Sequence, residues 1–202
     1  MTASPTVAPR RKIAIPNQKR WTRAEYERFV EMGAFTRDDR IELLEGIIVE
    51  KMPQKAPHSF GILSMGEALR QIFTEGYTIR TQMPLSLDAD SVPEPDLAVV
   101  AGSIRDYLQA HPTTAALVVE IADSSAWIDR KAKSRLYARA GIPEYVILNL
   151  PKRRLEVRRN PAEIPGRPRE FDYAEALLLT SKQKWSPLLA PDAQIAVAYL
   201  LP

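Results

Sequence analysis

The chain has 202 residues, of which 45% are hydrophobic and 26% charged, a length and balance that let a globular protein bury a core. It contains no cysteine, which excludes disulfides, thiolate zinc sites and cysteine nucleophiles, and we expect a reducing, cytoplasmic setting. The net charge of +3 is compatible with a polyanionic partner but does not identify one.

The N-terminal segment has an unusual composition. Residues 1–18 are rich in proline and small residues and lack the continuous apolar stretch of a secretory signal. We expect a disordered tail there, and a single domain in residues 19–202. No apolar run approaches the roughly 20 residues that cross a bilayer, so we expect no membrane partner.

The first half of the chain alternates helical and strand patterns. A helix is predicted between Thr22 and Gly33, because Thr22 and Glu25 form a capping-box pattern. Residues 40–52 are typical of two strands joined by a tight turn. Residues 59–76 carry apolar side chains at helical spacing and predict a second helix.

The second half contains the segments expected to form a buried sheet. A helix is predicted in residues 123–141, and a loose region of short elements in residues 176–202. Strands are predicted in residues 77–87, 96–102, 116–122 and 144–150, followed by an edge hairpin in residues 155–160 and 171–173. This order predicts an α/β fold with a central mixed sheet flanked by helices.

Several familiar kinds of functional site need residues that this sequence does not provide. Only eight glycines occur and none are clustered, which argues against a glycine-rich phosphate loop. Only His58 and His111 are available for a histidine zinc site or a serine triad. His58 begins the second helix, and we interpret it as a helix-start hydrogen-bonding residue rather than a ligand. Carboxylates and lysines remain as candidates.

Two carboxylates lie in apolar strand segments. Asp96 stands at the start of one predicted strand, and Glu120 lies within the next. Burying an unpaired carboxylate costs several kcal/mol, so each is expected to meet a cation or a hydrogen-bond donor. Either one alone could pair with a lysine or cap a turn. Two carboxylates converging from neighbouring strands suit Mg²⁺ or Mn²⁺, which prefer oxygen ligands.

Lys133 is the candidate cation. It lies four residues after Asp129 and four before Tyr137, so the three share one helical face. Two interpretations stay open: a surface ion pair with Asp129, or an ammonium group aimed at a metal-bound water or a scissile phosphate. Lys131 points about 200° away on a helix and is expected to be solvated, whereas Lys133 shares its face with apolar Leu136.

Two further patterns concern the site and its partner. Glu42 alternates with apolar residues on a predicted strand, so we expect it to face inward. Basic residues gather in four clusters, and two of them, residues 19–23 and 130–139, are interleaved with aromatic residues that could stack on bases, namely Trp21, Trp127 and Tyr137. The aromatic residues in these basic clusters are compatible with a nucleic-acid partner.

Several motifs in this order carry a family resemblance. They are WTRAEY, RIELLEG, KMPQKAPH, PEPDLAVV, VVEIADSS, DRKAKSRLYARAGIPEY and LEVRRN, and they run from about Trp21 to Asn160. With them the sequence resembles the Uma2-like endonucleases, which are assigned to the PD-(D/E)XK nuclease superfamily. The resemblance implies a restriction-endonuclease-like core.

The resemblance also implies a site. Asp96 is similar to the aspartate of the PD motif and Glu120 to the second acidic residue, whereas the usual lysine position is occupied by Ala122. The family resemblance implies that Lys133, on the next helix, takes the place of that lysine. The ligands of one or two Mg²⁺ or Mn²⁺ ions are then expected to be Asp96, Glu120, the carbonyl of Ile121 and Glu42.

The function implied is metal-dependent hydrolysis of phosphodiester bonds in nucleic acid, with DNA as the expected substrate. A homodimer is also expected, because cutting both strands usually needs two active sites. The alternative is a catalytically weak nuclease-fold protein that binds DNA or assists a mobile element. A sugar hydrolase with a carboxylate pair has thin support, because Trp127 is the one tryptophan near the carboxylates.

Overall fold

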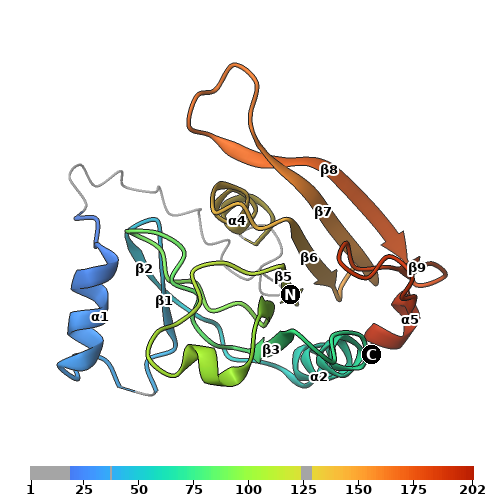
Figure 1. The fold of residues 1–202 in the computed structure, drawn as a ribbon, viewed down its shortest axis with the longest axis horizontal. Helices are drawn as coiled ribbons and strands as arrows, with labels where there is room; N and C mark the ends of the chain where they lie inside the picture. The colour runs from blue at the N-terminus through green and yellow to red at the C-terminus, as the bar shows by residue number, and fades with distance from the viewer. Residues whose placement is uncertain (1–18, 37, 124–128) are drawn as a thin grey trace, which may run out of the picture.

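A six-stranded mixed sheet forms the centre of the computed structural model, which describes residues 19–36, 38–123 and 129–202, without the side chains of residues 129 and 130. The strands lie in the order β3-β4-β5-β6-β7-β8, and all neighbours are antiparallel except β5 and β6 (Figure 1). Their bounds are β3 Tyr77–Thr81, β4 Leu97–Ala101, β5 Leu117–Ala122, β6 Glu144–Asn149, β7 Arg154–Glu163 and β8 Phe171–Thr180. The predicted mixed α/β sheet is confirmed.

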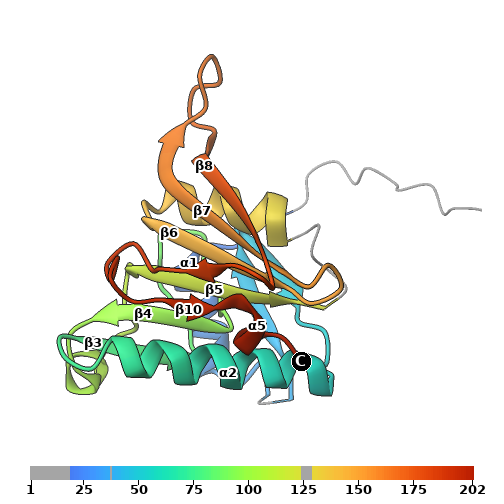
Figure 2. The same ribbon diagram turned by 90° about the vertical axis from the view of Figure 1, so that its right-hand side faces the viewer.

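Helices cover both faces of this sheet. Helix α2 (Ala56–Ile72) runs along one face (Figure 2), and its buried side chains share an apolar core with Leu97, Val99 and Val119. On the other face, α4 (Ser134–Arg139) shares a second core with Ala98, Val100 and Val118. Because both faces are covered, successive residues of β4 and β5 are buried, which explains their nearly continuous apolar sequences.

A separate hairpin lies beside the central sheet. Strand β1 (Ile41–Leu44) pairs antiparallel with β2 (Ile47–Glu50), as predicted. The turn residues Glu45 and Gly46 have φ angles of 48° and 76°, the positive values that a tight two-residue hairpin turn requires. The hairpin brings Glu42 toward the central sheet.

Helix α1 (Arg23–Glu31) packs on this hairpin at the edge of the molecule (Figure 1). The predicted capping box is present, since Thr22 and Glu25 bond reciprocally through side chain and backbone. A small apolar cluster joins the helix, the hairpin and the loop before β4 through Tyr26, Leu43 and Val92.

One predicted strand is shorter than expected. Residues 77–87 were predicted as a strand, but β3 ends at Thr81. Gln82 takes a φ of 50°, outside the extended region, and Pro84 cannot donate a ladder hydrogen bond. The chain therefore leaves the sheet and returns to it at Leu97, where β4 begins.

The C-terminal region contains short elements, as predicted, but the prediction that it is loose is wrong. Strand β8 runs through residue 180, and the short elements after it bury Trp185, Ile195, Val197 and Leu200. These elements are β9 (Lys184–Trp185), β10 (Ile195–Ala196) and α5 (Val197–Leu200). The buried carboxylate of Glu144 holds this region in place, because it accepts hydrogen bonds from Trp185 Nε1 at 3.2 Å and from Leu188 N at 2.7 Å.

Some predictions lie outside the described residues, namely the tail of residues 1–18 and the part of the predicted helix at residues 124–128. The remaining elements are η1 (Ile104–Tyr107) and the π-helical turn η2 (Asp129–Lys133).

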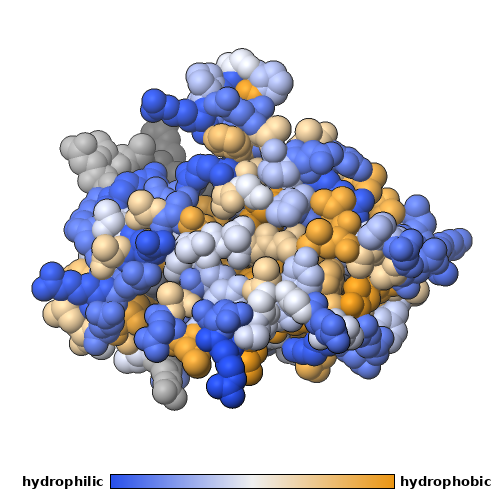
Figure 3. Space-filling view, in the orientation of Figure 1, coloured by the Kyte–Doolittle hydropathy of each residue, from blue (hydrophilic) through white to orange (hydrophobic). Residues whose placement is uncertain are grey.

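Within the described ranges, each helix is too short or too polar to cross a membrane. Figure 3 shows apolar residues gathered on the side where β8 and β9 lie, and Leu177 and Leu178 of β8 are exposed.

Helix α2 approaches the sheet closely at Gly61. A Cβ atom there would lie 2.9 Å from Ile121 Cγ2, whereas one at Gly66 would meet the flexible end of Arg70 at 3.0 Å. We expect Gly61→Ala to lower the free energy of unfolding by about 1–3 kcal/mol, because α2 must shift away from β5. Gly66→Ala should leave it unchanged or raise it, since alanine favours helix. Chemical denaturation measures both, and equal effects would contradict this packing.

Candidate active site

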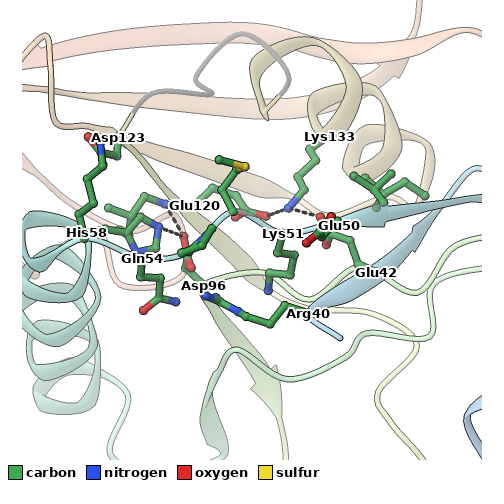
Figure 4. Close-up of a pocket in the computed structure, with 16 residues that line it drawn as sticks. Arg40, Glu42, Glu50, Lys51, Gln54, His58, Asp96, Glu120, Asp123 and Lys133 are labelled. Atoms are coloured by element: carbon green, nitrogen blue, oxygen red, sulfur yellow. Dashed lines mark hydrogen bonds and ion pairs between the residues drawn. The ribbon is translucent and has the colours of Figure 1, made fainter. Parts of the chain in front are cut away.

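A solvent-open hollow of about 220 Å³ lies where the β1–β2 hairpin, the start of α2, the sheet and η2 meet (Figure 4). We call it the site hollow. Its lining contains many charged side chains: Arg40, Glu42, Glu50, Lys51, Lys55, His58, Asp96, Glu120, Asp123 and Lys133. Every residue that the sequence predicted for the site therefore lines one hollow, together with Ile121.

Asp96 occupies the position directly before β4. Its Oδ2 accepts a hydrogen bond from the Ile121 backbone N–H at 2.8 Å and lies 3.2 Å from His58 Nε2, and its Oδ1 accepts one from Gln82 at 3.3 Å. Burial has the largest single effect and raises the pKa of Asp96, but the hydrogen bond and charge of His58, the Ile121 N–H and the charge of Lys133 together leave the pKa below its ordinary value. Asp96 is therefore held as a carboxylate.

His58 has a different role from the one predicted. It lies in the first turn of α2, but its ring reaches Asp96 rather than the helix start. Its Nδ1 is buried and has no hydrogen-bond partner among the described residues. The sequence could not reveal this contact, because it depends on how α2 docks against β4 and β5.

Glu120 faces α4 and η2 from the middle of β5. The register that pairs Leu97 with Val119 places Asp96 opposite Glu120 when continued by one residue. Glu120 Oε1 lies 2.8 Å from Lys133 Nζ and accepts a hydrogen bond from the Tyr137 hydroxyl at 2.9 Å. The predicted convergence of two strand carboxylates is thus present.

Lys133 lies between two carboxylates in the site hollow. Its Nζ is 2.8 Å from Glu120 Oε1 and 3.1 Å from Glu42 Oε1 (Figure 4). Only 5% of Lys133 is exposed, whereas Lys131 is exposed to solvent, as the helical spacing predicts. The alternative of an ion pair with Asp129 involves a side chain outside the described ones. Tyr137 is fully buried, so the prediction that it stacks on bases is wrong.

Glu42 reaches this site from β1. Its Oε1 contacts Lys133, and its Oε2 accepts a hydrogen bond from the Glu94 backbone N–H at 3.0 Å. Only 4% of Glu42 is exposed, as its inward-facing position in the strand predicts. Both carboxylate oxygens are therefore engaged by protein donors.

The sequence analysis missed three polar residues around the carboxylates. Lys51 donates to the carbonyl of Glu94 at 2.8 Å and lies 3.5 Å from its carboxylate, and Gln82 donates to Asp96. Burial raises the pKa of Glu94, with Glu42 adding to the effect and Lys51 opposing it. Glu94 stands beside Asp96 in PEPD and was visible as a candidate, whereas Lys51 and Gln82 carried no distinctive signal.

The donor set suits a partly hydrated Mg²⁺ ion. Among the side chains that the structure describes, no three carboxylates or imidazoles stand together as a ready-made metal cage. Mg²⁺ seldom uses such a cage, because it keeps several waters and usually binds through one or two carboxylates plus substrate phosphate. Asp96 and Glu120 supply two carboxylates on adjacent strands of an open hollow.

Comparisons with known proteins concern the family and the fold of this chain. The family model Uma2, described as "Putative restriction endonuclease", matches residues 23–198. No curated protein matches the sequence. The fold is similar to that of a crystal structure of "a putative nuclease belonging to DUF820" from Anabaena variabilis, with a TM-score of 0.67 and 14% identity over 89% of this chain and 96% of that chain. This likeness confirms the predicted fold class.

Proposed function

This chain belongs to the Uma2 family, and on that premise we propose that it is a Mg²⁺- or Mn²⁺-dependent endonuclease that hydrolyses phosphodiester bonds in DNA. One observation carries the proposal: the Lys133 ammonium lies against Glu120 and Glu42 in the hollow that also contains Asp96. Phosphodiester hydrolysis needs oxygen ligands for a metal ion and a cation near the phosphate, and this hollow offers both.

In this proposal Asp96 and Glu120 hold the metal ion, with the carbonyl of Ile121 as a further ligand. When bound, the ion would polarise the scissile phosphate and lower the pKa of the attacking water. Asp96 suits this role because its pKa stays below the ordinary value despite burial. The Ile121 N–H donates to the Asp96 carboxylate and fixes the orientation of that group.

Lys133 would stabilise the negative charge that develops on the phosphate oxygens. A buried ammonium group is costly unless carboxylates compensate it, and Glu120 and Glu42 supply that compensation. Tyr137 supports the arrangement by donating its hydroxyl to Glu120 from one turn further along the chain. Lys133 thereby lies beside the carboxylates although the usual lysine position in the strand holds Ala122.

Incubation of the protein with supercoiled plasmid and with single-stranded DNA tests this proposal. We expect cleavage with Mg²⁺ or Mn²⁺ and none with EDTA, because the phosphate must be polarised by the ion. Salt-sensitive DNA binding without cleavage under any of these conditions would contradict the enzyme and favour the DNA-binding alternative.

The substitution Glu42→Gln tests whether Glu42 is a metal ligand or a residue that positions Lys133. Because both of its oxygens are engaged by Lys133 and Glu94, we expect Glu42→Gln to lower cleavage about tenfold, on the scale of a lost supporting contact. Calorimetry should show Mn²⁺ affinity close to that of the wild type, whereas Glu120→Gln should weaken it at least about tenfold. Equal losses of affinity would instead make Glu42 a ligand.

A further inference from the structure

A second hollow lies next to the site hollow, between α1 and the start of β1. It has a volume of about 540 Å³, within the range of roughly 300–1,000 Å³ that is usual for small-ligand pockets. Its lining includes Tyr26, Val30, Phe35, Arg40, Lys51 and Glu94. The proposed metal ligands are not among the lining residues of this hollow, so hydrolysis does not account for it.

The two hollows adjoin each other. Arg40 and Lys51 line both of them, and the Lys51 backbone N–H donates to the Arg40 carbonyl at 2.6 Å. In Figure 4 both side chains lie on the same side of the site as Asp96. A polymer could therefore place one group in the site hollow and the neighbouring group in the second hollow.

The walls of the second hollow differ in character. The half-buried ring of Phe35 forms an aromatic wall, and the buried Tyr26 lies behind it, with ring centroids 6.1 Å apart and ring planes tilted by 34°. Polar side chains of both charges form most of the remaining lining, namely Thr36, Asp39, Arg40, Lys51, Gln82 and Glu94. A flat group with apolar faces and a polar edge matches such walls, and nucleobases are groups of this kind.

Arg40 adds a positive charge at the junction. Within the part of the chain that the structure describes, its guanidinium group makes no hydrogen bond or ion pair, while the neighbouring Lys51 is bound to Glu94. An arginine whose donors are available at the junction of two hollows suits a phosphate, which it can hold through two parallel hydrogen bonds.

We propose that the second hollow binds one unpaired nucleobase of the DNA strand being cut, and that Arg40 holds the phosphate linking that nucleotide to the site hollow. This inference rests on the proposed function and names its substrate as DNA with an unpaired base. A base within a duplex must leave the stack to enter such a hollow, so single-stranded DNA is the preferred ligand.

Fluorescence anisotropy in EDTA tests the inference without cleavage. The probes are a labelled thymidine 12-mer and an abasic 12-mer, which has the same phosphates but no bases. We expect the wild type to bind the thymidine 12-mer at least about fivefold more tightly, on the scale of one stacked base. Equal affinity for the two probes would overturn the inference.

Matched variants locate the effect. Phe35→Leu removes the ring but keeps an apolar side chain, and should abolish the preference for the thymidine 12-mer. Phe29→Leu is the control, because Phe29 lies on α1 against Trp21 and does not line the second hollow. Arg40→Gln should lower the affinity for both probes by the same factor, since it removes a phosphate contact. An unchanged preference in Phe35→Leu, or unchanged affinities in Arg40→Gln, would contradict the assignment.

The outcome is separable from that of the proposed function. The preference for the thymidine 12-mer is measured without metal, so it does not depend on cleavage. A protein that shows this preference but never cuts DNA would overturn only the proposed endonuclease activity. Conversely, Mg²⁺-dependent cleavage together with equal binding of the two probes would overturn only the base-binding hollow.

Discussion

We expect Asp96→Asn to lower Mg²⁺-dependent cleavage of DNA by at least about 10²-fold while the protein remains folded. Asparagine keeps a side-chain oxygen that can accept the Ile121 N–H, so the main change is the loss of negative charge toward the ion. Single-turnover kinetics with plasmid DNA measures the effect. Asp123→Asn is the control, because Asp123 also lines the site hollow but is not a proposed ligand. Its side chain is partly exposed and forms a long ion pair of 3.8 Å with Lys55.

The same substitution has a consequence for stability. Burial alone would raise the pKa of Asp96 above its ordinary value of 3.8, but His58 and the Ile121 N–H lower it, so the folded state favours the ionised form. The stabilisation is present above pH 3.8 and is lost as the pH falls through the lowered pKa. Asp96→Asn should therefore melt at a lower temperature than the wild type at neutral pH, and this difference should shrink below pH 3.8.

Lys133→Ala should reduce cleavage by about 10²-fold or more, on the scale of a lost charge-stabilising group. Lys131→Ala is the matched control, because Lys131 is exposed two residues away and can lose at most one phosphate contact. Metal binding should survive in both variants, since neither lysine is a ligand. The reverse ranking of the two cleavage rates would show that the wrong lysine has been assigned.

Lys133→Ala should also destabilise the metal-free protein. Glu120 and Glu42 would lose the ammonium group that lies between them, and removing one partner from a buried ion pair costs about 3–5 kcal/mol. Thermal melting should show a large decrease for Lys133→Ala and almost none for Lys131→Ala. Added Mn²⁺ should restore part of the stability, because a cation would again lie near the carboxylates. No recovery with Mn²⁺ would argue against a metal ion at this position.

Much of the site could be predicted because its signals are local. Asp96 and Glu120 interrupt apolar strand sequences, and a carboxylate in such a place needs a partner. The orientation of Lys133 followed from its spacing to Leu136 and Tyr137, both of which are buried. The central strands were recognisable because helices cover both faces of the sheet.

The remaining features depend on contacts between segments far apart in the sequence. The contact between His58 and Asp96 follows from the docking of α2, which its own sequence pattern does not specify. The prediction of a loose C-terminal region failed because its elements are short and polar residues separate them. They are held by Glu144, a residue of β6, through Trp185 and Leu188. The second hollow likewise forms only where α1 meets the hairpin.

A time course of plasmid nicking in Mg²⁺, with wild type and Asp96→Asn purified side by side, tests the central claim most directly. The pair also controls for contaminating nucleases, which would cut equally in both preparations. The metal site proposed here predicts nicking by the wild type that EDTA abolishes, and a rate at least about 10²-fold lower for Asp96→Asn. Equal rates for the two proteins in Mg²⁺ would contradict it.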